Sequence, residues 1–203
     1  ALLDFLPFAD NNSVTAAVQE SLVSLAMTNG RPDPDVIAAL KDDHPAKRGA
    51  AAVALWRAGG KEQRATIRGL LNESADSVRL QVALQLAYAR EKEAFSVLID
   101  LLGRLPPEHA WAAEDVLLRL AGERAPIVAL GKDAASRAKC RDAWMAWWRD
   151  HGDKLDLSAL NAPERPLGYT MVVLLDLGRV LELTADGKER WSMEGLQFPL
   201  DVQ

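Results

Sequence analysis

Ala-Lys-Arg-Gly-Ala-Ala-Ala-Val-Ala-Leu, residues 46–55, is the stretch that decides the fold, because the chain repeats it. It recurs as Ser-Val-Arg-Leu-Gln-Val-Ala-Leu-Gln-Leu at 77–86 and, more loosely, as His-Ala-Trp-Ala-Ala-Glu-Asp-Val-Leu-Leu at 109–118. Arg48 and Arg79 are 31 positions apart, and Trp in the third copy follows 32 positions after Arg79. A repeat of this length is typical of solenoids, in which each unit buries its core by stacking on its neighbours.

Each copy is preceded by a second apolar run with helical spacing. In these runs, large apolar residues recur one to four positions apart, at Val36, Ile37 and Leu40, at Ile67, Leu70 and Leu71, and at Leu98, Ile99 and Leu102. Such spacing places them on one face of a helix. The sequence therefore predicts a mainly α fold, a right-handed α-solenoid of three to four helix pairs.

The C-terminal part of the chain changes character twice. A helix is predicted at 133–151, with Cys140 and several tryptophans on one face, and the Pro- and Gly-containing stretch 153–168 is typical of a linker. Beyond it, short β-branched runs surround Ala185-Asp186-Gly187, a strong hairpin signal. We predict a solenoid with a Trp-rich capping helix at 1–152, a linker at 153–168 and a small antiparallel β segment at 169–203.

The repeated helix pairs resemble HEAT repeats of the short bacterial type, the kind also found in phycobilin-lyase-like proteins. The resemblance covers about residues 10–122 and depends on the Ala-rich second helices, on Arg48 and Arg79 at their starts, and on acidic residues in the turns. It implies a ladder of arginine and turn aspartate between neighbouring repeats. In the third copy, Trp111 takes the place of the ladder arginine.

The segment 178–191, Gly-Arg-Val-Leu-Glu-Leu-Thr-Ala-Asp-Gly-Lys-Glu-Arg-Trp, is similar to one blade edge of a β-propeller of the PQQ-binding or NHL sort. A single blade cannot close a ring. The chain also starts at Ala1 without a methionine, and we therefore interpret it as a piece of a longer or processed protein. An orphaned strand edge of this kind is expected to pair with a second copy, as a homodimer.

Composition narrows the classes of function. The chain has 203 residues, 24 basic and 29 acidic, for a net charge of −5. A dedicated nucleic-acid binder normally carries the opposite balance. The single cysteine excludes an internal disulfide framework and a multi-cysteine metal site. The apolar runs are too short to span a bilayer, and nothing in the sequence indicates a compartment.

No catalytic motif, phosphate loop or zinc-binding helix motif occurs in the sequence, and we predict no catalytic residue, metal or cofactor. Asp42-Asp43-His44 and the end of the Trp-rich helix at His151 have potential metal-binding side chains, but each lies at a turn or helix terminus, where capping is the commoner role. Glu114 and Asp115 are adjacent on a helix and diverge by about 100°, so they cannot form a catalytic pair. The tryptophans could stack a base or a flat cofactor, or cap the open end of the solenoid, which we favour.

The inner helices predict a contact surface on the concave side. If Ala51, Ala52 and Leu55 face the outer helix, Ala50, Ala54 and Arg57 face the concave side. The 31-residue step then gives Gln81, Gln85 and Tyr88, and the next step gives Ala113, Leu117 and Leu120. Exposed leucines would be costly, so either the Trp helix or β segment of the same chain, or a foreign peptide, should cover them.

The predicted binding residues are Arg57, Gln81, Gln85, Tyr88, Leu117 and Leu120. The leading hypothesis is a non-catalytic scaffold that binds a protein or peptide there. A nucleic-acid module is the alternative from another class, and a bilin-lyase-like protein is suggested by family kinship alone.

Overall fold

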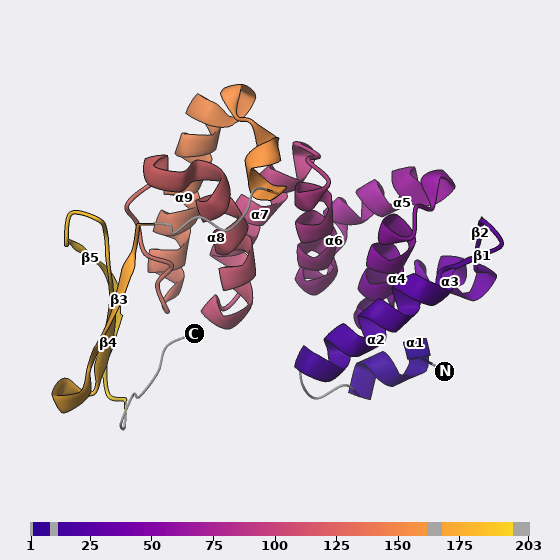
Figure 1. Ribbon diagram of the computed structural model, residues 1–203, viewed down its shortest axis with the longest axis horizontal. Helices are drawn as coiled ribbons and strands as arrows, with labels where there is room; N and C mark the ends of the chain where they lie inside the picture. Colours follow the sequence, from indigo (N-terminus) through magenta and orange to yellow (C-terminus); the bar gives the residue numbers. More distant parts are fainter. Residues whose placement is uncertain (1, 9–11, 162–167, 197–203) are drawn as a thin grey trace. The chain divides into compact units, whose positions relative to one another are not determined.

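The computed structural model describes residues 2–8, 12–161 and 168–196 of the chain (Figure 1). The chain divides into two compact units, Ala1–Leu98 and Ile99–Gln203. The expected linker at 153–168 and β segment at 169–203 therefore fall in part, at 162–167 and 197–203, outside the described residues.

Helices account for most of the described chain. The α-helices are α1 (Leu2–Phe5), α2 (Asn12–Leu25), α3 (Pro34–Ala39), α4 (Pro45–Arg57), α5 (Arg64–Gly69), α6 (Asp76–Tyr88), α7 (Glu93–Arg104), α8 (Pro107–Ala121) and α9 (Ala134–His151). The 3-10 helices are η1 (Leu6–Phe8), η2 (Lys61–Gln63), η3 (Leu70–Asn72), η4 (Gly122–Arg124), η5 (Gly152–Lys154), η6 (Leu157–Asn161) and η7 (Leu175–Leu177). The prediction of a mainly α fold with a small C-terminal antiparallel sheet is confirmed.

In the first unit, α2, α4 and α6 lie side by side as the inner layer, and α4 packs on both of its neighbours. The Gln19 side chain of α2 donates a hydrogen bond of 3.0 Å to the Ala50 carbonyl of α4. The shorter α3 and α5 precede α4 and α6 along the chain as the outer helices of each pair. Asp33 begins α3, because its carboxylate accepts hydrogen bonds from the free amides of Asp35 and Val36.

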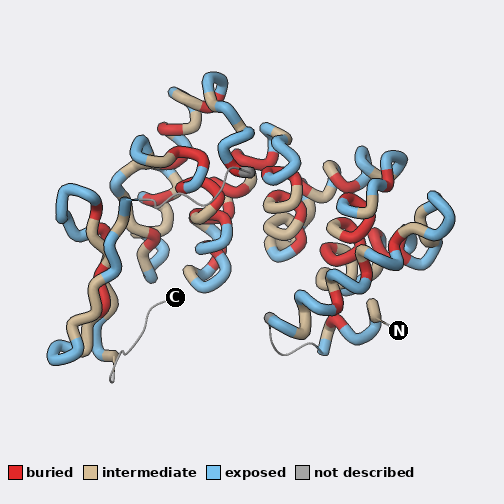
Figure 2. Tube along the Cα trace, viewed as in Figure 1, coloured by how far each residue is buried: buried red, intermediate tan, exposed pale blue. Residues whose placement is uncertain are grey.

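Burial follows a constant 31-residue step through all three copies. Figure 2 shows buried and exposed residues alternating along the helices. The shared interior positions of the inner helices are Ala51, Ala52, Leu55 and Trp56 in α4, Val82, Ala83, Leu86 and Ala87 in α6, and Ala113, Glu114, Leu117 and Leu118 in α8. The outer helices keep the same step, with Val36, Ile67 and Leu98 all buried. The three copies thus bury the same positions, with one exception in residue type. Glu114 occupies the position that is alanine in the other two copies, Ala52 and Ala83.

The second unit contains α8, α9 and a three-stranded antiparallel sheet in the order β3 (Thr170–Leu174), β4 (Arg179–Leu183), β5 (Glu189–Met193). A second, minimal sheet joins β1 (Met27–Thr28) to β2 (Arg31–Pro32) in the first unit. The β4–β5 hairpin turns at the expected Asp186-Gly187, where Gly187 has φ +78°, a conformation that favours glycine.

The pairing of β4 with β5 contains a bulge. Glu182 lies opposite Trp191, whereas Leu183 lies opposite Glu189, so Arg190 is an extra residue without a partner on β4. A bulge re-aims the side chain of the extra residue and increases the local twist. The register of β3 with β4 is regular over all five residues.

Candidate functional site

The exposed face of α6 carries the most accessible of the predicted contact residues. Tyr88 is 41% exposed, and Gln81, Leu84 and Gln85 are half-buried. Spacings of three, four and seven residues place all four on one face of the helix. The opposite face packs into the core through Val82, Leu86 and their neighbours. We call these four residues, with Arg57 of the adjoining helix, the α6 surface.

Arg57 lies at the end of α4, 31 residues before Tyr88, so the two residues have equivalent positions on neighbouring helices. Its guanidinium donates two hydrogen bonds to the Glu20 carboxylate, of 2.6 and 3.0 Å. This fork-to-fork geometry holds the side chain in place. The pair also cancels the charge of Arg57, and the α6 surface is therefore nearly neutral.

The close approach of α4 to α6 depends on Gly49. A side-chain carbon at this position would overlap the amide group of Gln81, so Gln81 lies flat against the glycine. The Oε1 atom of Gln81 is buried there, without a hydrogen-bond partner among the described residues. Gln81 thus contributes to packing between repeats as well as to the surface.

The two ladder arginines bind the turns at the starts of the inner helices. Arg48 donates to the carbonyl oxygens of Asp42 (2.8 Å) and Asp43 (3.0 Å) in its own repeat. It also pairs with the Glu73 carboxylate of the following turn at 2.9 Å. Arg79 repeats part of this pattern, with bonds to the Leu71 carbonyl and the Asp76 carboxylate. Arg48 therefore links neighbouring repeats, through a glutamate where the resemblance implies an aspartate.

The third copy differs from the sequence alignment by one residue. Because burial keeps the 31-residue step, the counterpart of Arg48 and Arg79 is Ala110, which is fully buried. Trp111 instead corresponds to Gly49 and Leu80, and it is 52% exposed. The expectation that Trp111 replaces the ladder arginine is therefore wrong.

The same shift explains the position of the two predicted leucines. Leu117 is 0% exposed, because it is the counterpart of the core residues Leu55 and Leu86. Leu120 is also buried, at 5% exposed. This fits the alternative in which the chain itself covers them. The outward side of α8 carries Ala112, Asp115 and Arg119 instead, the last two joined by an ion pair of 2.8 Å.

A buried charge cluster in the second unit was not predicted from the sequence. Arg190, at the β5 bulge, donates a 2.7 Å hydrogen bond to Oε1 of Glu114 in α8 and a 2.5 Å bond to Oε2 of Glu182 in β4. Its guanidinium also lies 5.1 Å from the centre of the Tyr169 ring. Glu114 and Arg190 are only 5% and 8% exposed. This cluster joins the sheet to α8.

The position of Glu114 has a structural meaning. Its counterparts in the other copies are Ala52 and Ala83. On α4, the row that contains Gly49 and Ala52 packs against the next inner helix, α6. On α8, the same row meets the β-sheet through Arg190. The sheet therefore occupies the side of α8 on which a further inner helix would stack, which is the role of a capping element.

Burial shifts the pKa values of the acidic groups in and beside this cluster. It raises the pKa of the Glu114 carboxyl, and the neighbouring Arg190 opposes that shift. Burial also raises the pKa of the Cys140 thiol to about 12. Cys140 is 0% exposed and lies 3.9 Å from Glu114. A neutral, enclosed thiol is a packing group and not a nucleophile.

The remaining sequence candidates lie at helix ends or in the core. His44 caps α4, because its Nδ1 accepts a hydrogen bond from the Ala46 amide. His151 bonds to the Trp147 carbonyl at the end of α9 and stacks on the Trp147 ring. Trp144 and Trp147 are buried in an edge-to-face pair with ring centres 5.5 Å apart. These indoles fill the interior, where they offer no stacking surface.

Comparison with known families finds one resemblance, and it covers the helix pairs. Residues 34–126 match the family model described as HEAT repeats. The helix pairs of this range are therefore similar to HEAT repeats. The match begins at α3 and ends just after α8, and we call this range the HEAT segment. No curated protein and no solved structure matched the chain significantly.

Within the described ranges, no group of three or more His, Cys, Asp or Glu side chains is arranged to hold a metal ion. Among the helices of these same ranges, none is both long and apolar enough to cross a bilayer.

Proposed function

We propose that the chain is a non-catalytic interaction module and that the α6 surface, formed by Arg57, Gln81, Leu84, Gln85 and Tyr88, binds a protein or peptide partner. The observation that carries this proposal is Tyr88, a large aromatic side chain that is 41% exposed on a helix held rigidly by its buried opposite face. Exposed tyrosines on rigid elements are frequent anchors of protein interfaces, because they bury much area at little entropic cost.

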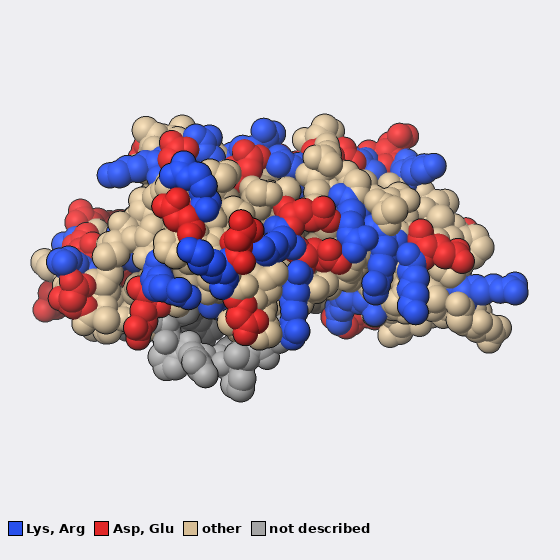
Figure 3. All heavy atoms as spheres, turned by 90° about the horizontal axis from the view of Figure 1, so that it is seen from above, with Lys and Arg blue, Asp and Glu red and all other residues tan. Residues whose placement is uncertain are grey.

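The chemistry of the surface favours a polypeptide. The Gln85 carboxamide can both donate to and accept from a peptide backbone, whereas the Oε1 atom of Gln81 is buried against Gly49. Arg57 is already neutralised by Glu20. A nucleic-acid partner requires unpaired cations, and Arg57 is the one cation of the α6 surface. Figure 3 shows acidic and basic side chains together on the face seen from above, with the basic ones adjoining one another in its right-hand part. The bilin-lyase alternative gains no support from any contact of the described residues.

A photo-crosslinking amino acid placed at Tyr88 tests the proposal. The matched control carries the same group at Thr66, which is exposed on the outer helix α5. In extracts of the source cells, position 88 should capture a defined protein that position 66 does not. Unlabelled wild-type chain should compete for that protein, whereas the double variant Gln85→Arg, Tyr88→Glu should not. Equal capture at both positions, or equal competition by the double variant, would refute the proposal.

A further inference from the structure

Among the described residues, the outer edge of β3 pairs with no other strand. β3 lies at one side of the sheet, and no strand of the described residues lies beyond it. In a strand paired on one side only, alternate residues direct their N–H and C=O groups away from the sheet. Such an edge is a template for another strand.

The two edges of this sheet differ in how they are protected. β5 carries the charged Glu189 and Arg190 and contains the bulge, and both features discourage further pairing. β3 reads Thr-Met-Val-Val-Leu, without a charge, a proline or a bulge. Met171 is 39% exposed and Thr170 is also exposed. The sheet is therefore closed to addition at β5 and open at β3.

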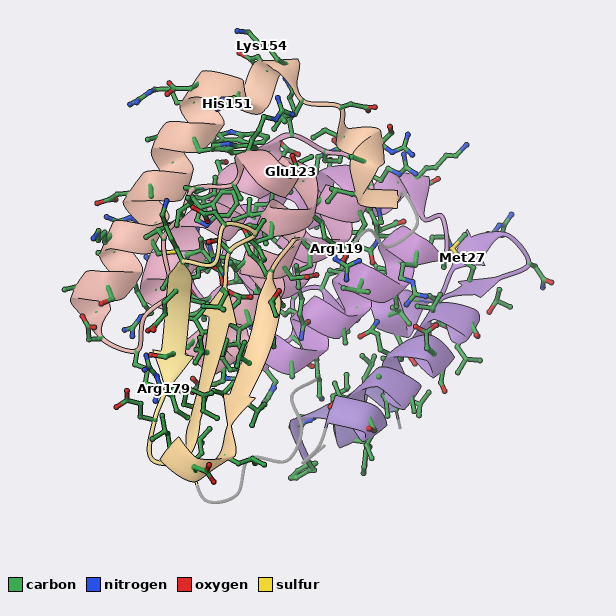
Figure 4. All side chains as sticks on the ribbon, turned by 60° about the vertical axis from the view of Figure 1, so that its left-hand side comes forward. Met27, Arg119, Glu123, His151, Lys154 and Arg179 are labelled. Carbon is green, nitrogen blue, oxygen red and sulfur yellow. The ribbon has the colours of Figure 1, made fainter. Side chains whose placement is uncertain are left out.

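The two faces of the sheet can be distinguished from the register. Glu182 points towards α8, because Arg190 bonds to both Glu182 and Glu114. Leu181 follows the opposite alternation. Val172 and Ser192 lie directly beside Leu181 on either side, so these three residues form one row on the face turned away from α8. Figure 4 shows the three strands side by side, with Arg179 near the end of the sheet that carries η7.

We propose that β3 pairs with β3 of a second copy of this chain, antiparallel and centred on Val172. A twofold axis perpendicular to the sheet keeps each residue on its own face, so a residue can only lie opposite one on the same face. Centring on Val172 satisfies this condition and pairs all five residues. Thr170 then faces Leu174 of the other copy, Met171 faces Val173, and Val172 faces itself.

A second copy fits this edge because the pairing is self-complementary. All opposed side chains are uncharged, so no like charges meet in the symmetric arrangement. On the face turned away from α8, the half-buried Val172 and Leu174 of one copy would lie next to the same residues of the other copy and form one apolar row with them. The result is a six-stranded sheet shared by two chains, each contributing its own charge cluster. This surface is independent of the α6 surface.

Charge-swapped variants of the full chain test this pairing by sedimentation equilibrium and native mass spectrometry. The wild-type chain should show a concentration-dependent dimer. Val172→Lys and Val172→Glu should each raise the dimer Kd about tenfold or more, because like charges would lie directly opposite each other. An equimolar mixture of the two variants should restore dimers that contain one chain of each.

Ser192→Lys is the matched control, since it introduces the same charge in the same row at the other edge. It should leave the dimer unchanged. Far-ultraviolet circular dichroism confirms that each variant is folded. A wild-type chain that stays monomeric at the highest soluble concentration overturns the proposal. A Ser192→Lys variant that weakens the dimer as much as the Val172 variants also overturns it. A dimer that persists in both Val172 variants, with no preference for mixed dimers in the mixture, overturns it as well.

Discussion

The buried cluster of Glu114, Glu182 and Arg190 makes the sharpest energetic prediction. Replacing Arg190 with methionine keeps most of the side-chain volume but removes the cation that both carboxylates share. Glu114 is 5% exposed and would be left as an uncompensated charge in the interior. Removing one partner of a buried ion pair costs about 3–5 kcal/mol, and we expect Arg190→Met to lower the stability of the second unit by that amount at neutral pH.

Glu114→Gln should behave very differently from Arg190→Met. The amide still accepts the hydrogen bond from Arg190, the cation keeps Glu182, and the unfavourable burial of the Glu114 charge is removed. The cost should stay within about 1 kcal/mol, the usual range for exchanging one hydrogen bond for another.

The pH dependence follows from the raised pKa of Glu114. A carboxyl whose pKa is higher in the folded than in the unfolded state favours folding below the unfolded pKa. That contribution is lost as the pH rises through the folded pKa. Arg190 opposes the upward shift, so Arg190→Met should raise the pKa of Glu114 further. The deficit of Arg190→Met relative to wild type should therefore shrink on acidification.

Amide hydrogen exchange in β3, β4 and β5, combined with urea unfolding, measures these effects in the unit concerned. Local exchange is needed because two units in one chain need not unfold together. The reasoning fails if Arg190→Met costs less than about 0.5 kcal/mol, the level of an ordinary surface substitution. It also fails if Glu114→Gln is as destabilising as Arg190→Met.

Three further predictions concern single residues. Arg48→Ala should lower the free energy of unfolding, measured by urea titration, by about 1–3 kcal/mol, because it removes an ion pair and leaves turn carbonyls without their donor. Arg57→Ala removes only an exposed ion pair and should cost less than about 1 kcal/mol in the same titration. His44→Ala should destabilise α4 by about 0.5–2 kcal/mol through loss of its N-cap, and His44→Asp should recover most of that stability. Cys140, with its pKa raised to about 12, should resist iodoacetamide at mildly alkaline pH until the chain is unfolded, as read by mass spectrometry; rapid alkylation of the folded chain would contradict its burial.

The helix pairs could be predicted because their signal is local and periodic. The apolar positions of the inner and outer helices recur at the spacing that stacked helices require, and the strands follow a hairpin signal at Asp186-Gly187. The third copy was harder, since aligning Trp111 with Arg79 introduced a slip of one residue. A slip of one turns a helix by about 100°, and this moved Leu117 from the core to the expected surface.

The charge cluster was missed for a different reason. Glu114 and Arg190 are 76 positions apart, and no periodic pattern relates them. One signal was present in the sequence: a 31-residue step assigns Glu114 to the alanine position of Ala52 and Ala83. A charged residue in a repeated core position requires a buried partner of opposite charge. The sequence pattern does not indicate which arginine is the partner of Glu114.

The 31-residue register through the third repeat is the claim on which the buried leucines and the capping role of the sheet depend. Maleimide labelling of Ala112→Cys and Ala113→Cys tests it most directly, because these adjacent, conservative substitutions compare an exposed position of α8 with a fully buried one. Native Cys140, which is buried, serves as an internal control in both proteins. Cysteine at 112 should react as fast as in an unfolded peptide, and cysteine at 113 should be protected at least about 100-fold, as expected for a group exposed only by unfolding. Equal rates, or faster reaction at 113, would contradict the account.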